Sequence, residues 1–212
     1  MEYCSGLTSL DVSMFTSLSM LDISGLNFAT VDLSNNTELT MLYAMGSGLT
    51  GDLDFTHLSK LQTLNLNDSV GITSVDVSNI TTLNVLYLEG CTGVQKIIAS
   101  NCTSLSNIYF ETDALTHFCI EQTQYTGNDV VTGSLTFLMN NVLQVLKIDG
   151  CNGITSLDLS QANSITEVTV ANCLELREFR ADATTASYTV DASTCTSLGV
   201  VSTDQYVTVI MP

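Results

Sequence analysis

Apolar residues recur along this chain in a short pattern of an apolar residue, any residue and a second apolar residue, which runs from Leu10 to Val201. Fourteen of the seventeen intervals between the first residues of successive patterns are eleven residues long. Alternation of apolar and polar residues is typical of a β-strand with one buried side, and a fixed period indicates units that stack on their neighbours. The pattern therefore predicts a solenoid of stacked short strands.

A helical supercoil is the alternative, because eleven residues approximate three turns of helix. The units of this chain are rich in Thr, Ser, Asn, Asp and Gly, which are poor helix formers. Long helices are built instead from Ala, Glu, Lys, Leu and Arg. Composition therefore favours an all-β fold.

Two kinds of unit alternate along the sequence. One follows glycine, as in residues 71–78, and the other follows small polar residues and leucine, as in residues 81–88. One complete coil is then 21 or 22 residues long and carries a strand on each of two sides. Corresponding strands of successive coils pair in parallel, which predicts a right-handed solenoid of about nine coils with a parallel sheet on each side.

The units also carry a family resemblance. Read from three residues before the first apolar residue, they follow Leu-x-x-Leu-x-Leu-x-x-(Asn/Cys)-x-x-Leu, which resembles the leucine-rich repeat in its short bacterial form with nested halves of ten or eleven residues. The resemblance covers nearly the whole chain. It implies a protein that bacteria of the Bacteroidetes type secrete or display on their surface, often adhesive and without inherent enzymatic activity.

That family places an inward Asn or Cys five residues after the first apolar residue. This chain matches at Asn36, Cys91, Cys102, Asn140, Cys151, Cys173 and Cys195. It departs from the family at Phe15, Leu26, Leu58, Ile80 and Ala162. We expect the stacked cysteines to be buried fillers, with disulfide or metal roles as the alternatives. Cys119 differs because it lies at an outward position, and we expect it to be the most reactive thiol.

The eleven-residue period is interrupted once, by a seventeen-residue interval between Phe118 and Leu135. We expect an irregular insertion at residues 122–133 that replaces one half-coil and carries recognition residues Tyr125, Asn128 and Asp129; a tolerated loop without function is the alternative. Residues 206–210 predict a terminal strand outside the period, within a C-terminal cap at residues 204–212. The chain is thus predicted to be a single solenoid domain over residues 1–212.

Charge narrows the set of partners. The chain has 22 acidic and 5 basic residues and a formal net charge of -17, so it should repel nucleic acid and anionic membrane surfaces. No apolar run is long enough to predict a membrane-spanning segment. A basic partner or a cation is expected, with binding that weakens as salt rises. Because Met1 leads almost directly into a repeat, we expect that a signal peptide, and with it an N-terminal cap, has been removed.

Outward positions of the non-glycine units form a candidate binding face. Tyrosines there offer a large rigid surface with a polar tip, which suits a protein surface or a sugar ring; simple packing between strands is the alternative. The candidate contact residues on this strip are Tyr43, Asn65, Tyr87, Glu89, Tyr109 and Glu111. If the insertion replaces a half-coil, Lys147, Thr169 and Asp191 continue the same face.

Outward positions of the glycine-preceded units repeat an aspartate at Asp11, Asp32, Asp54 and Asp76. Carboxylates stacked at about 4.8 Å repel one another unless donors or cations offset the charge. The Ser or Thr two residues further on is a ready donor. Weak calcium binding is the alternative, although the usual acidic calcium-loop motifs are absent.

Catalytic signals are sparse. His57 and His117 are the only histidines, and neither belongs to a nucleophile motif. We therefore expect no enzyme and no cofactor, with a glycosidase built on paired carboxylates as the open alternative. The sequence predicts a binding module of the cell surface or secreted medium that adheres to a protein or host surface. A glycan-binding module, with or without calcium, and a structural spacer of a larger surface protein are the other candidate functions.

Overall fold

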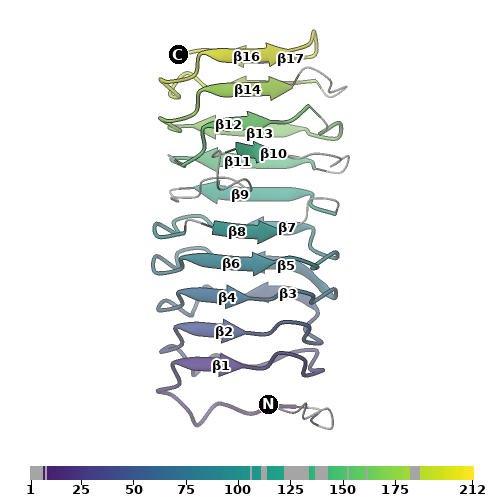
Figure 1. The fold of residues 1–212 in the computed structure, drawn as a ribbon, viewed down its shortest axis with the longest axis vertical. Coiled ribbons are helices and arrows are strands. Elements are labelled where there is room, and N and C mark those ends of the chain that lie inside the picture. The colour runs from purple at the N-terminus through teal and green to yellow at the C-terminus, as the bar shows by residue number, and fades with distance from the viewer. Residues whose placement is uncertain are drawn as a thin grey trace.

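The protein is a β-solenoid whose short parallel strands stack along one axis, with its two termini at opposite ends (Figure 1). This computed structural model describes residues 7, 9–105, 107–110, 114–121, 134–136, 143–151, 153–160, 162–181 and 187–212. Within these ranges the chain forms strands and turns but no helix, and so none that is long and apolar enough to cross a membrane. The all-β solenoid predicted from the repeat is confirmed.

The first face of the solenoid carries two parallel sheets, one of five strands and one of four. The five-stranded sheet contains β1 (Met20–Asp22), β2 (Met41–Tyr43), β4 (Thr63–Asn65), β6 (Val85–Leu88) and β8 (Asn107–Phe110). The four-stranded sheet continues this side in Figure 1 with β10 (Ser134–Thr136), β12 (Ser156–Asp158), β14 (Glu178–Ala181) and β16 (Val200–Thr203).

The second face carries a six-stranded and a two-stranded parallel sheet. The larger sheet contains β3 (Gly51–Asp54), β5 (Ile72–Asp76), β7 (Lys96–Ile98), β9 (His117–Glu121), β11 (Val145–Asp149) and β13 (Glu167–Ala171). The smaller sheet pairs β15 (Tyr188–Asp191) with β17 (Val207–Ile210), and β15 packs beside β13. The terminal strand expected outside the period is therefore present as β17.

The long interval after β9 does not remove a half-coil, contrary to the sequence-based expectation. Phe118 pairs with Leu146 on the second face, whereas Leu135 pairs with Leu157 on the first. The strands keep alternating between faces because each sheet needs its next strand to satisfy its backbone hydrogen bonds. Lys147 consequently lies beside Cys119 on the second face and does not extend the tyrosine strip.

Two more residues that were expected to extend the tyrosine strip also lie on the second face. Thr169 is the register partner of Lys147, and Asp191 belongs to β15, so both lie on the second face. Their places on the first face are taken by Thr136, Asp158 and Arg180. The insertion itself, residues 122–133, lies outside the described residues.

Apolar side chains from both faces form one continuous core. On the first face Leu42, Leu64, Leu86 and Ile108 are partners in register, and each is at most 2% exposed. Each side chain of this size stabilises the fold by about 1.5–3 kcal/mol when it is removed from water. The alternation read from the sequence therefore places its apolar residues inward, as predicted.

The corners of the coils explain the recurrence of Gly, Asn and Asp. Asp68, Asn79, Asn101 and Asn172 have φ angles of 61°, 66°, 60° and 50°, and Gly90 lies at 71°. This left-handed conformation is disfavoured for most residues but is open to Gly, Asn and Asp. The polar residues that argued against helices are thus the ones that turn the chain between faces.

The position that holds an inward Asn or Cys supplies a hydrogen-bond donor to backbone carbonyl groups. The Asn36 side chain donates from Nδ2 to the carbonyl oxygens of Val12 at 3.0 Å and Phe15 at 2.9 Å. The Cys102 thiol donates to the Val77 carbonyl at 3.0 Å, and burial raises the pKa of this thiol to about 11. Cys91 donates in the same way to the Leu66 carbonyl at 3.0 Å, and the described cysteines other than Cys119 are buried.

Replacement of one inward residue tests this arrangement. We expect Leu86→Ala to lower the free energy of unfolding by about 2–5 kcal/mol, because the rigid stack leaves a cavity. Urea denaturation followed by circular dichroism measures the loss. Val85→Ala is the matched control, since Val85 is half-buried and points outward from the same strand. Equal losses for the two variants would contradict the assignment of inward and outward positions.

Candidate binding surface

Tyrosine, methionine and valine side chains gather on the outward side of the first face. We call this surface the tyrosine face; it comprises the outward residues of β2, β4, β6 and β8. Its principal members are Met41, Tyr43, Asn65, Val85, Tyr87 and Tyr109. Parallel register places them in two columns across neighbouring strands.

Two tyrosines of this surface pack against each other. The rings of Tyr87 and Tyr109 stack with their centroids 5.0 Å apart and an interplanar angle of 9°. Packing between strands, the alternative to a purely recognition role, is thus observed for this pair, which is only half-buried and so still contacts solvent. The stack covers one side of each ring, and a sugar could stack only on the other side.

Tyr43 stands apart from this pair, because Asn65 lies between them in the register. The Tyr43 hydroxyl donates to the Met41 sulfur at 3.6 Å, which links the two columns of the face. The side-chain oxygen of Asn65 accepts a hydrogen bond from the Asn67 backbone amide at 3.0 Å. Asn65 therefore also stabilises the turn that follows its strand.

A second row of the face was missed from the sequence. Met20, Met41 and Val85 occupy the position before the first inward residue, directly beside the tyrosine column. Met20, on the neighbouring strand β1, is 49% exposed and so is open to solvent. The sequence does carry a signal for this row, because the outward position is apolar in several coils of the same kind. A position that only faces water has no need of apolar residues.

Glu89 lies at the margin of the tyrosine face, where Asn67 holds it. The Asn67 Nδ2 donates to Glu89 Oε2 at 3.0 Å, and the Glu89 backbone amide donates to Asn67 Oδ1 at 2.8 Å. This reciprocal pair fixes a carboxylate beside the tyrosine column. The other sequence-based candidates, Glu111, Tyr125, Asn128 and Asp129, lie outside the described residues.

The aspartates of the second face cap turns. Asp11, Asp32 and Asp76 accept hydrogen bonds from the backbone amides of Ser13, Ser34 and Ser78, each at 2.9 Å. Asp54 accepts from the amide and hydroxyl of Thr56 at 2.8 and 2.7 Å. The Ser or Thr expected to offset the carboxylate charge is thus the observed partner.

These hydrogen bonds favour the ionised carboxylates. Bonds from the hydroxyl and amide of Ser13 lower the pKa of Asp11, and those from Thr56 lower the pKa of Asp54. Asp54 and Asp76 are register partners, whereas Asp11 and Asp32 lie on segments outside the sheets. No cluster of three or more His, Cys, Asp or Glu residues suited to a metal occurs in the described part of the chain, and calcium here stays a prediction.

Comparisons with known proteins add little beyond this geometry. No protein-family model matches the sequence, and no curated protein is significantly similar to it. The functional domain of InlJ from Listeria monocytogenes, which includes a cysteine ladder, is a similar solved structure, with a TM-score of 0.37, 18% identity and coverage of 96% of this chain and 56% of that chain.

An internalin, InlF, from Listeria monocytogenes strain 4b F2365 is similar with a TM-score of 0.31 and 16% identity, covering 96% of this chain and 79% of that chain. This chain thus spans little more than half of the InlJ chain. Strand register and core burial define the solenoid fold of this chain.

The aspartate caps predict a dependence of stability on pH. The pKa of Asp11, Asp32 and Asp54 is lowered from 3.8 in the folded state, so their bonds stabilise the fold above about pH 4 and are lost as pH falls below it. In the triple variant Asp11→Asn, Asp32→Asn and Asp54→Asn, we expect Tm to fall less steeply between about pH 5 and pH 2.5 than in the wild type. Calorimetry across this range measures both slopes, and parallel curves would contradict the assignment.

Proposed function

We propose that this solenoid is a non-catalytic module, secreted or displayed on a bacterial surface, that binds another protein through the tyrosine face. The observation that carries the proposal is the half-exposed stack of Tyr87 on Tyr109 beside the outward side chain of Val85, with Met41 and Tyr43 two strands away on the same face. Tyrosine and methionine are enriched in protein interfaces, and an aromatic anchor near the centre often contributes most of the binding energy.

The rigidity of the surface supports this function. The strands that carry the tyrosine face are held in parallel register on a buried core, so their outward side chains start from a nearly fixed arrangement. Ordering of side chains and loops on association opposes binding. A face that is already ordered loses less freedom, which favours a flat, preorganised contact.

Charge supports a basic partner. The chain carries a net charge of -17, and Glu89 stands at the margin of the tyrosine face. Long-range attraction of this kind mainly raises the association rate and is screened by salt. The proposed complex therefore forms by electrostatic attraction and is held by aromatic and aliphatic contacts.

Substitution of one tyrosine tests the proposal. The labelled chain is applied to an array of purified extracellular protein domains printed beside a glycan array. For each protein that binds, we expect Tyr87→Ala to weaken binding by at least about tenfold, the usual effect of removing an interface anchor. Titration by surface plasmon resonance measures the affinities, and the association rate should fall as salt rises.

Tyr206→Ala is the matched control, because Tyr206 is exposed on the turn before β17, far from the tyrosine face along the rod. It should leave affinity unchanged. A protein ligand insensitive to both Tyr87→Ala and Val85→Asp would contradict the proposal. Binding to glycans alone would favour the sugar-binding function, and absence of binding to either array would favour the structural spacer.

A further inference from the structure

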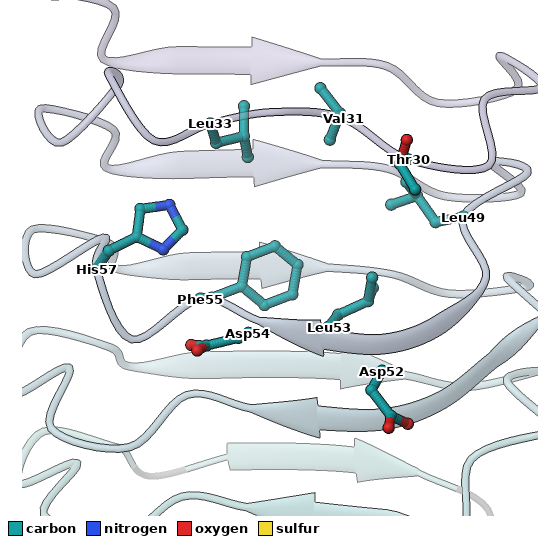
Figure 2. Close-up of a pocket in the computed structure, with 9 residues that line it drawn as sticks. All are labelled: Thr30, Val31, Leu33, Leu49, Asp52, Leu53, Asp54, Phe55 and His57. Atoms are coloured by element: carbon teal, nitrogen blue, oxygen red, sulfur yellow. The ribbon is translucent and has the colours of Figure 1, made fainter.

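The second face contains a cleft between the segment at residues 31–33 and β3. Its apolar lining is formed by Val31, Leu33, Leu49, Leu53 and Phe55, and its volume is about 220 Å³ (Figure 2). In Figure 2 the side chains of Leu53 and of Phe55, just after β3, extend toward the coil that carries Val31 and Leu33, whereas Asp52 points away from it. We call this space the β3 cleft. It lies on the face opposite the tyrosine face.

Backbone hydrogen bonds are missing across this cleft. The residue two after the first inward position normally donates to the next coil: Phe55 donates to the Asp76 carbonyl at 2.9 Å and Val77 to that of Ile98 at 3.0 Å. Among the described residues the equivalent bond from Leu33 to Asp54 is absent, as is the one from Val12 to Asp32 in the preceding coil. β3 is accordingly the last strand of its sheet, although another coil lies beyond it.

The bonds that remain define the two ends of the cleft. At one end the Thr50 amide still donates to the Ala29 carbonyl at 3.1 Å. Beyond the other end, Lys60 forms an ion pair with Glu38 at 2.7 Å. Between these points the edge of β3 faces the segment at residues 31–33 across a space lined by core side chains. Unpaired edges of this kind are templates for an added strand.

The rim of the cleft is acidic. Asp54 lines the cleft at the end of β3, and Asp32 lies on the opposite segment, whereas the Asp52 carboxylate accepts a hydrogen bond from the Thr73 hydroxyl of the following coil at 2.7 Å. Hydrogen bonds from Ser34 and Thr56 lower the pKa of Asp32 and Asp54, which keeps both carboxylates charged at neutral pH. His57 is the one basic-type side chain in the lining.

We propose that the β3 cleft binds an extended peptide segment of a partner protein as an added strand, with alternating apolar and basic side chains. Its backbone would bond to the free edges of β3 and residues 31–33. Its apolar side chains would enter the cavity beside Leu53 and Phe55, and its Lys or Arg side chains would face Asp32 and Asp54. Side chains of a strand alternate in this way with a period of two.

The cavity and the charge both favour this occupant. An apolar cavity of roughly 150 Å³ accepts a guest the size of benzene, so 220 Å³ suits one or two large apolar side chains rather than a drug-sized molecule. A second copy of this chain would bring another net charge of -17 to an acidic rim. Repulsion opposes that pairing, whereas a basic segment is attracted.

A synthetic peptide tests the proposal directly. The probe is an acetylated, amidated and fluorescently labelled heptapeptide of alternating lysine and leucine, titrated against the full chain by fluorescence anisotropy. We expect saturable binding that weakens with salt. A peptide of alternating glutamate and leucine should not bind, and N-methylation of alternate amides should weaken binding about tenfold, because it removes the strand hydrogen bonds.

Two pairs of variants locate the site. Val31→Phe should fill the cleft and weaken binding at least tenfold, whereas Val201→Phe alters an equivalent half-buried position on the first face and should not. Asp54→Asn should weaken binding, whereas Asp158→Asn should not, although Asp158 caps the Ser160 amide at 2.9 Å in the same way. Circular dichroism confirms that each variant is folded.

Hydrogen exchange supplies an independent measurement. The peptide should slow exchange of the Leu33 amide, and should leave unchanged that of Ala192, which already donates to the Ile210 carbonyl at 3.0 Å. Unchanged exchange at Leu33, or equal binding of the N-methylated peptide, would overturn the proposal. Tyr87→Ala should not affect the peptide, so the outcome is independent of the proposed function of the tyrosine face.

Discussion

The parallel pairing of inward apolar residues in successive coils is the constraint on which this structure depends. Leu64 lies between Leu42 and Leu86 in the register, and all three are fully buried. No coil can bury these side chains by itself, so each coil is stable only against its neighbours. The corner residues, the inward cysteines and the aspartate caps all maintain this stacking, by turning the chain or by satisfying backbone groups between strands.

Residues that point outward are not constrained by the stacking of the core and are therefore available for recognition. Alternate residues of every strand point away from the core, and their identity can vary without disturbing the stack. The two faces have diverged accordingly. The first face presents aromatic and aliphatic side chains over β2 to β8, whereas the start of the second face presents aspartates. The two proposed binding sites are therefore chemically different and lie on opposite sides of the same rod.

The β3 cleft shows what happens where the stacking is interrupted. A bulge between Gly51 and Asp52 shifts the register of β3 on β5, and the preceding coil no longer pairs with β3. Core side chains such as Phe55 stay buried there, but the strand edges lose their partners. The sheet of this face begins at β3, although two coils precede it, so its first edge lies within the rod, where a foreign strand can be accepted.

Much of the architecture could be predicted from the sequence. The eleven-residue alternation identified the inward residues of the strands, from Leu42 to Val190, and the polar corners excluded helices. The tyrosine column was also predictable, because Tyr43, Tyr87 and Tyr109 recur at one outward position. The adjoining row of Met20, Met41 and Val85 carried a weaker signal and was missed.

Only the tertiary structure decided which face each strand joins after the long interval, since the choice depends on hydrogen bonds between residues far apart in sequence. It moved Lys147, Thr169 and Asp191 to the second face. Only the folded chain also showed that Tyr87 stacks on Tyr109 and that Leu33 lacks a partner beside β3. Local periodicity determines which side chains point inward, because alternation is a property of a single strand. Whether two neighbouring coils pair or separate depends on contacts between two strands, so it cannot be read from the sequence of one repeat.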